Sequence, residues 1–465
     1  MAGYIPRKID SDLLYWKDSA DRKPLLLRGA RQVGKSCAVR NLGRNFENFI
    51  EINFENKDFD DAKKIFEKHS NPRLICDELS ALCNKPIKPG ETLLFLDEVQ
   101  ACADAISSLR YFYEQMPGLH IIAAGSLLEF ALQKIPSYAV GRVRYIFMYP
   151  FSFEEFLIAS RQNNLLEKLI AASPENPVSD EVHNKLSEFF IRFLVIGGMP
   201  EVVAKYTGED GGTLLDCQNI LDDLTGGFFI DFAKYKQRVP ANRLEEAFSD
   251  IIAQTGHKFV YSQAASSANY LHAKESIELL KMSGLVYSAT HSSADGLPLA
   301  ARANKRYRKL MIFDTGIYQR FLQLDLSDIL LNNKIEQVNK GALAEMFVGI
   351  ELVKAQNNRR PAELYYWQRE KSGSTAEVDY IMPIGGNIIP IEVKAGTKGA
   401  MQSMFLFLNE KQRPCGVRCS MENFGRAPNI KIYPLYAAGK ILNTFTFADG
   451  NAKPDNAVFQ RFIGN

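Results

Sequence analysis

Residues 29–36 read Gly-Ala-Arg-Gln-Val-Gly-Lys-Ser and stand between a short apolar run, Pro24–Arg28, and a helix-like segment over 37–42. This order of strand, glycine-rich loop and helix predicts a phosphate-binding loop, because backbone N–H groups and the positive end of a helix both favour anions. In such a loop Lys35 reaches the β- and γ-phosphates and Ser36 binds magnesium. The predicted nucleotide contacts begin with Gly29, Ala30, Arg31, Gln32, Val33, Gly34, Lys35, Ser36 and Cys37.

A second segment ends in two carboxylates, Asp97 and Glu98, after the continuous apolar run Leu93–Leu96. Such a run suits a parallel strand that is buried on both faces. Ligands of open α/β sheets bind beyond the carboxyl ends of the strands, where these two side chains emerge. We therefore expect Asp97 to hold magnesium and Glu98 to orient or deprotonate an attacking water. An acidic strand end without function is the alternative, and the loop at 29–36 argues against it.

Two further residues are candidates for contacting the transferred phosphate. Ser126 follows the apolar strand-like run 120–125, where a polar residue senses the γ-phosphate in ATPases with an extra strand between the two motifs. Ser126 serves equally well as the N-cap of a helix over 127–133. Arg142 suits charge stabilisation on the phosphoryl group, from its own chain or a neighbouring subunit. A surface ion pair is the favoured alternative for Arg142.

Several short motifs together resemble a family of bacterial and archaeal AAA+-type ATPases. They are, in chain order, Tyr4–Arg7, the loop with Arg31-Gln32 after its first glycine, Leu96-Asp97-Glu98, Gly125-Ser126, Gly141-Arg142 and Pro150–Phe156. The resemblance implies a five-stranded parallel sheet in the order 5-1-4-3-2, with ATP and Mg²⁺ as cofactors. It names no substrate.

The chain has 465 residues, which is too many for one core, since cores stop growing at roughly 250–300 residues. We expect a multidomain α/β protein with an ATPase domain over 1–150, a helical lid over 151–235, a winged helix over 236–330 and a further domain over 331–465. The helical lid contains Gly197-Gly198-Met199-Pro200, and similar proteins carry Gly-Gly-x-Pro there. The alternative is that these residues only end one helix and begin the next.

The predicted winged helix combines helices over 244–254, 261–266 and 274–282 with strands over 285–290 and 309–313. The segment 302–309 contains Arg302, Lys305, Arg306, Tyr307, Arg308 and Lys309. Five cations around a tyrosine suit contact with DNA or RNA phosphates. However, Glu275 and Glu278 on the presumed recognition helix would repel phosphates, so packing between domains is the favoured alternative.

The C-terminal region contains two strand-like runs around Gly385-Gly386, a pair suited to a two-residue hairpin turn. If Ile384 and Asn387 flank that turn, Asp379 lies directly opposite Glu392 on the same face. Lys394, two residues further on, points the same way. Two close carboxylates repel each other unless a divalent cation or a proton intervenes.

This geometry predicts a metal-dependent phosphodiesterase site. Its metal ligands would be Glu345, Asp379 and Glu392, and its catalytic residues Asp379, Glu392 and Lys394, with Glu345 contributed by the preceding helix. The arrangement resembles the restriction-endonuclease-like fold. The alternative is a binding module that cuts nothing, in which Lys394 neutralises the acids.

Composition and charge argue against several other classes of protein. A net charge of +2 imposes no global preference for nucleic acid or membrane. No apolar run approaches the roughly 20 residues of a membrane-spanning helix, and the N-terminal residues lack the apolar core of a signal peptide. The seven scattered cysteines argue against a disulfide framework or a structural zinc. We therefore expect a cytoplasmic protein, with oligomerisation left open.

The leading hypothesis from the sequence is an ATPase whose nucleotide state controls a nuclease-like C-terminal domain acting with DNA or RNA. Its rival is a nucleotide-operated signalling or interaction switch with a non-catalytic terminal domain.

Overall fold

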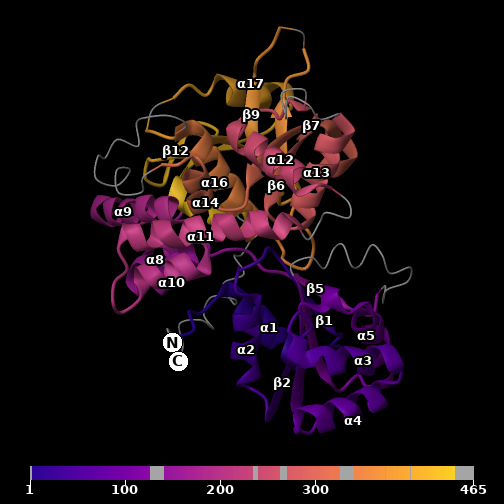
Figure 1. The fold of residues 1–465 in the computed structure, drawn as a ribbon. Coiled ribbons are helices and arrows are strands. Elements are labelled where there is room, and N and C mark those ends of the chain that lie inside the picture. Colours follow the sequence, from indigo (N-terminus) through magenta and orange to yellow (C-terminus); the bar gives the residue numbers. More distant parts are fainter. Residues whose placement is uncertain are drawn as a thin grey trace.

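The computed structural model describes residues 3–125, 141–233, 239–261, 270–324, 340–371, 373–397 and 399–445. Two β-sheets organise these residues, a five-stranded sheet near the N-terminus and an eight-stranded sheet formed by the second half of the chain (Figure 1). Ser126 and most of the predicted helix over 261–266 lie outside the described residues.

The first sheet is parallel throughout and has the order β2-β3-β4-β1-β5. This confirms the predicted order, read from the opposite edge. Its strands are β1 (Leu25–Arg28), β2 (Asn48–Asn53), β3 (Thr92–Asp97), β4 (His120–Ala124) and β5 (Arg144–Phe147). The α-helices beside them, among the described residues, are α1 (Lys8–Asp18), α2 (Lys35–Gly43), α3 (Asp60–Lys68), α4 (Pro72–Cys83) and α5 (Ala103–Gln115).

Alternate residues of the central strands face two different cores. Leu25 and Leu27 pack in the cluster that includes the apolar residues of α1 and α2, whereas Leu26 packs in the cluster of α3, α4 and α5. Because both faces are covered, every residue of β3 is buried. That double burial is why the strands read as continuous apolar runs in the sequence.

A helical segment follows the first sheet. Its helices are α7 (Phe153–Ala159), α8 (Asn163–Ala171), α9 (Asp180–Ile196), α10 (Pro200–Thr207) and α11 (Leu214–Phe232). Ser152 and Glu155 form a capping box at the start of α7. Helix α9 ends at Gly197, whose φ of +74° favours glycine, and Pro200 opens α10. The helices are present as expected, while their role as a lid stays a prediction.

The region assigned to a winged helix contains α12 (Ala241–Ala253), α13 (Tyr270–Met282), β6 (Val286–Ser292), β7 (Ala303–Ile312) and α14 (Thr315–Phe321). Strands β6 and β7 are antiparallel, as a wing requires. However, β6 also pairs in parallel with β8, with Ala289 opposite Leu364. The predicted domain boundary near residue 330 therefore falls within one continuous sheet. A separate winged helix is not confirmed, and the four-domain division stays a prediction.

The second sheet has the order β12-β13-β11-β10-β9-β8-β6-β7. Its remaining strands are β8 (Leu364–Gln368), β9 (Glu377–Ile384), β10 (Asn387–Val393), β11 (Gly416–Ser420), β12 (Gly425–Ala427) and β13 (Ile430–Pro434). The helices of this region are α16 (Lys340–Ala355), α17 (Gln402–Glu410) and α18 (Ile441–Thr444). A restriction-endonuclease-like fold is not confirmed for this part of the chain.

The hairpin of β9 and β10 has the predicted register. Ile384 pairs with Asn387 and Tyr380 with Ile391. Gly385 and Gly386 between the strands have φ values of +55° and +77°, as a two-residue turn with two left-handed positions requires.

One apolar cluster runs from the helices of the first sheet through the helical segment into α16. Phe190 of α9 contacts Phe153 of α7 and Phe347 of α16, with ring centroids 6.1 and 4.9 Å apart. The helical segment therefore links the two sheets by packing as well as by chain connection. Among the helices of the described residues, none is both long and apolar enough to cross a membrane.

Candidate functional site

The glycine-rich loop joins the end of β1 to the start of α2, as predicted. Gly29 has a φ of +146°, and a Cβ atom there would lie 2.1 Å from the carbonyl oxygen of Met148. Gly34 precedes α2 with a φ of +95°. Both positions favour glycine because L side chains are strained at such φ values, and at Gly29 the carbonyl oxygen of Met148 also leaves no room for a Cβ atom. Packing of β5 against β1 thus shapes the loop.

Lys35 is buried in the first turn of α2. Its ammonium group donates to the carbonyl oxygens of Gly29 and Ala30, at 3.0 and 2.7 Å. Burial lowers the pKa of Lys35 to about 8, and nearby Glu98 and Asp97 partly oppose that shift. A buried cation therefore lies against the loop, where an anion would strengthen its charged form.

Ser36 and Asp97 meet at the carboxyl edge of the parallel sheet. The Ser36 hydroxyl donates to Asp97 Oδ2 at 2.8 Å, and the backbone N–H of Glu98 donates to Asp97 Oδ1 at 3.0 Å. Burial raises the pKa of Asp97. Hydroxyl and carboxylate oxygens are ligands that Mg²⁺ prefers. These two residues therefore fit the predicted magnesium position.

Glu98 follows Asp97 in a left-handed backbone conformation, with a φ of +47°. Gln100 donates from Nε2 to Glu98 Oε2 at 2.6 Å. Gly125, at the end of β4, borders this pair closely, because a Cβ atom on Gly125 would lie 2.1 Å from Gln100 Oε1. The sequence analysis did not identify Gln100 as a functional residue. Its position two residues after Glu98 was the feature that could have indicated a contact with that carboxylate. The amide orients the carboxylate that we expect to act on water.

Arg7 is a second residue that sequence reasoning left without a role. Its buried guanidinium donates to the carbonyl oxygens of Val33 and Tyr149, at 3.2 and 2.8 Å, and to Glu155 Oε1 at 2.9 Å. Arg7 therefore ties the loop to the capping box of α7. The position of Arg7 within the Tyr4–Arg7 motif was the feature of the sequence that could have indicated this role.

The other predicted nucleotide contacts have different surroundings. Arg142 pairs with Glu114 of α5, with Nε and Oε1 2.5 Å apart, which favours the surface ion pair over a phosphate contact. Arg31 pairs with Asp231 of α11, and Cys37 is exposed on α2.

The hairpin brings Asp379, Glu392 and Lys394 together as predicted. Asp379 Oδ2 accepts a hydrogen bond from the backbone N–H of Val393 at 2.8 Å. Lys394 donates to Glu392 Oε1 at 2.8 Å. Burial and the charge of Asp379 raise the pKa of Glu392 to about 7. The predicted cluster therefore exists, and its catalytic role stays a prediction.

Lys309 enters the same cluster from β7, which the sequence did not suggest. Its ammonium group lies 2.8 Å from Glu345 Oε1, 2.5 Å from Glu377 Oε1 and 3.6 Å from Asp379 Oδ1. The side chain of Lys309 is only 2% exposed. These carboxylates hold the pKa of Lys309 well above its usual range, although burial alone would lower it. Lys309 is therefore an internal cation of the cluster.

This ammonium group bears directly on the predicted metal centre. Lys309 contacts two of the three proposed ligands, Glu345 and Asp379, and Lys394 contacts the third, Glu392. Within the described residues, no group of three or more His, Cys, Asp or Glu side chains is arranged to hold a metal ion. Two lysines thus offset part of the charge of the four carboxylates Glu345, Glu377, Asp379 and Glu392, and the metal site stays a prediction.

The segment 302–309 is also less basic on its surface than expected. Lys309 points into the acid cluster, and Arg308 is buried in an ion pair with Glu278. The patch predicted for phosphate contact therefore lacks two of its five cations. Lys305 and Arg306 remain exposed. The burial was invisible in the sequence, since the acidic partners lie on distant segments.

Comparisons with known proteins agree with this site. Residues 21–157 match the family model described as an AAA domain. That match covers the glycine-rich loop, Asp97 and Glu98. The AAA-domain match, the order of the parallel sheet and the loop geometry support a P-loop ATPase.

Two further family models match later segments of the chain. Residues 187–328 and 340–438 each match a domain of unknown function, DUF8612 and DUF4143 respectively. No curated protein matches the chain.

Solved structures that match the chain include the Walker-type ATPase PABY2304 of Pyrococcus abyssi, at 17% identity and a TM-score of 0.43. The match covers 69% of this chain and 96% of that one. Another is the Aeropyrum pernix ORC1 protein in complex with DNA, at 11% identity and a TM-score of 0.28, covering 72% and 94%.

Proposed function

We propose that the chain is a Mg²⁺-dependent ATPase with its catalytic centre between the loop at 29–36 and the end of β3. The observation that carries the proposal is the hydrogen bond between Ser36 and Asp97 beside the buried ammonium of Lys35. A triphosphate at this loop would receive backbone N–H groups, the N-terminus of α2 and one lysine. The expected ligand is ATP.

Each residue of this centre has a distinct task. Ser36 and Asp97 would hold Mg²⁺, which neutralises charge on the triphosphate when bound. Lys35 would exchange its two carbonyl acceptors for phosphate oxygens. Glu98, oriented by Gln100, would accept a hydrogen bond from the attacking water and draw it into line with the phosphorus atom.

The base of ATP would enter a cavity of about 730 Å³. Its lining includes Gly3–Pro6, the end of α7 and the end of α10. The neighbouring residues Arg7 and Pro200 border the loop, since a Cβ atom on Gly34 would lie 3.7 Å from Arg7 Nη1 and from Pro200 Cγ. The apolar side chains of Ile5, Pro6 and Ile158 suit a planar base.

Phosphate release from ATP by the intact chain tests the ATPase proposal. We expect turnover that requires Mg²⁺ and stops when EDTA is added. A chain that binds ATP tightly without ever releasing phosphate would contradict hydrolysis. A chain that binds no nucleotide would contradict the assignment of the site.

The pH dependence of ATP binding gives a second test. Because burial lowers the pKa of Lys35 to about 8, the unliganded protein loses the lysine charge above that pH. Binding then requires proton uptake, so the dissociation constant should rise about tenfold for each pH unit above 8. Isothermal titration with a non-hydrolysable ATP analogue from about pH 7 to pH 9.5 measures this. An affinity that stays constant over that range would show that Lys35 remains charged without nucleotide.

For the C-terminal cluster, the contacts of Lys309 and Lys394 favour the second hypothesis from the sequence. In that hypothesis the protein is a nucleotide-operated switch whose terminal domain does not cleave nucleic acid. Two lysines already accompany the four carboxylates of Glu345, Glu377, Asp379 and Glu392. ATP binding would then reposition the helical segment and the second sheet through contacts such as Arg7 with Glu155 and Arg31 with Asp231. A DNA or RNA partner would have the exposed Lys305 and Arg306 to contact.

Lys309→Met tests whether Lys309 compensates the charge of the cluster. Removing one partner of a buried ion pair costs about 3–5 kcal/mol, so we expect a large loss of stability near pH 8. Buried carboxylates are easier to protonate, as the raised pKa values of about 8 for Glu345 and about 7 for Glu392 indicate. The loss should therefore shrink as pH falls toward about 5. Thermal unfolding at both pH values measures this, with exposed Lys305→Met as the control.

A Lys309→Met loss that is equal at both pH values would show that Lys309 does not compensate the charge of these carboxylates. Cleavage of DNA or RNA by the intact chain with Mg²⁺ or Mn²⁺ that disappears in Lys394→Ala would overturn the non-catalytic reading.

A further inference from the structure

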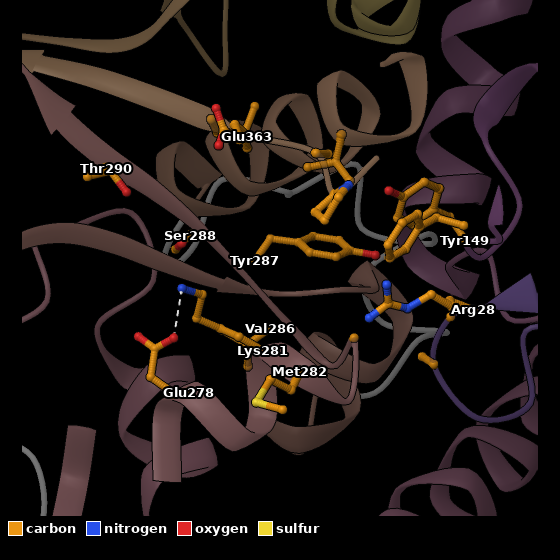
Figure 2. A pocket seen from close by; sticks show the side chains of 18 of the residues that line it. Arg28, Tyr149, Glu278, Lys281, Met282, Val286, Tyr287, Ser288, Thr290 and Glu363 are labelled. Carbon is orange, nitrogen blue, oxygen red and sulfur yellow. Dashed lines mark hydrogen bonds and ion pairs between the residues drawn. The ribbon is translucent and has the colours of Figure 1, made fainter. Parts of the chain in front are cut away.

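A cavity of about 580 Å³ lies between the glycine-rich loop and the eight-stranded sheet (Figure 2). Gly29 and Ala30 form part of one wall, and the end of α13 with strands β6 and β7 forms another. The volume falls within the roughly 300–1,000 Å³ of small-molecule sites. This cavity is distinct from the one proposed for the base of ATP, which lies at Gly3–Pro6.

Two cations from separate elements reach this cavity and share one carboxylate. Arg308 of β7 pairs with Glu278 through Nη1, and Lys281 of α13 lies 3.3 Å from the same carboxylate. Arg308 is only 9% exposed, and its Nε atom is buried without a hydrogen bond among the residues that the structure describes. Arg28, Lys305 and Glu363 also line the cavity, so its four cations outnumber its two carboxylates, Glu278 and Glu363. A donor that is buried without an acceptor is costly, so the arrangement suits an anionic ligand.

Aromatic and hydroxyl groups line the rest of the cavity. Tyr287 of β6 contacts Tyr149 edge to face, with ring centroids 6.1 Å apart, and both rings border the cavity (Figure 2). Ser288 and Thr290 bring hydroxyl groups from the same strand. Aromatic rings offer surfaces on which nucleobases stack, and hydroxyl groups hydrogen-bond to phosphate or sugar.

We propose that this cavity binds a nucleoside monophosphate unit, with its phosphate at Lys281 and Arg308 and its base against Tyr149 and Tyr287. The unit is either a free nucleotide or the end of a nucleic-acid strand, because both present the same chemistry. The site goes beyond the proposed ATPase centre and does not depend on it.

The site is also placed to communicate with the ATPase centre. The turn after α13 touches the loop, since a Cβ atom on Gly284 would lie 3.1 Å from the backbone nitrogen of Ala30. On β7, Arg308 borders the cavity while the adjacent Lys309 belongs to the acid cluster. A ligand here would contact the wall formed by Gly29 and Ala30. If that contact changes the affinity for ATP, linkage requires ATP to change the affinity of this site by the same factor.

Isothermal titration of the full chain tests the proposal. The Lys35→Ala variant serves as the background, so that failure of the ATPase proposal and failure of this one remain distinguishable. The probes are AMP, a 5′-phosphorylated single-stranded hexanucleotide and inorganic phosphate. We expect AMP or the strand to bind, and Lys281→Met to weaken that binding at least about tenfold, as expected for a charge-assisted phosphate contact. Lys274→Met, an exposed position on the same helix, should leave binding unchanged.

The comparison between probes identifies the source of the ligand. Tighter binding of AMP than of the hexanucleotide supports a free nucleotide, and the reverse supports a strand end. Thr290→Trp, which fills the cavity without changing its charge, should also abolish binding. The proposal is overturned if neither AMP nor the strand binds, if inorganic phosphate binds as tightly as both, or if Lys281→Met and Thr290→Trp both bind like the background protein.

Discussion

Lys35→Ala should raise the dissociation constant for ATP by roughly 100-fold or more, because contacts of an ammonium with phosphate oxygens contribute about 1.5–3 kcal/mol each. The ammonium lies within hydrogen-bond distance of the Gly29 and Ala30 carbonyl oxygens, beside the amides that would receive the triphosphate. Removing it leaves the phosphates without their principal side-chain cation. Isothermal titration with a non-hydrolysable ATP analogue and Mg²⁺ measures the effect.

The control for this variant is Lys64→Ala. Lys64 is an exposed lysine on α3, and its side chain is 72% exposed, so its loss should leave ATP affinity unchanged. Thermal unfolding of both variants shows whether the fold survives. A folded Lys35→Ala protein that binds ATP as tightly as the native chain would mean that the triphosphate does not lie at residues 29–36.

Glu98→Gln should preserve ATP binding and slow hydrolysis by about 10²–10⁴-fold, the usual contribution of a general base. The amide keeps the shape of the carboxylate, but it accepts a proton poorly and cannot draw water toward the phosphorus atom. Rates of phosphate release at saturating Mg²⁺ and ATP, together with binding of the non-hydrolysable analogue, separate the two effects.

Glu91→Gln provides the matched control, since Glu91 lies just before β3 in an exposed ion pair with Lys88. Its hydrolysis rate should equal that of the native chain. If Glu98→Gln hydrolyses ATP at the native rate, another group activates the water. If it loses ATP binding instead, Glu98 serves to hold the nucleotide.

The ATPase module could be predicted from the sequence because its signals are local. An apolar run, a glycine-rich loop and a helix lie within residues 24–42, and each favours its structure without help from distant segments. Gly385 and Gly386 are a local signal of the same kind. They define the turn, and the turn defines the register that places Asp379 opposite Glu392.

The surroundings of these groups depend on contacts between distant segments. Ser36 and Asp97 lie on separate elements, and their meeting at 2.8 Å followed from strand order, which the family resemblance implied. No motif or family resemblance indicated the role of Lys309. The sequence placed it in an exposed wing among other cations, whereas the pairing of β6 with β8 places its strand in the same sheet as Glu377 and Asp379.

The sequence by itself predicted where a triphosphate would bind, because the loop, the lysine and the carboxylate strand are each encoded within a few consecutive residues. Only the tertiary structure decided what surrounds the C-terminal acids and what lies beside the loop. Charge compensation inside a protein depends on which side chains meet in space, and Lys309, Arg7 and Arg308 all meet partners at least thirty residues away. Local sequence patterns do not show which distant side chains come into contact.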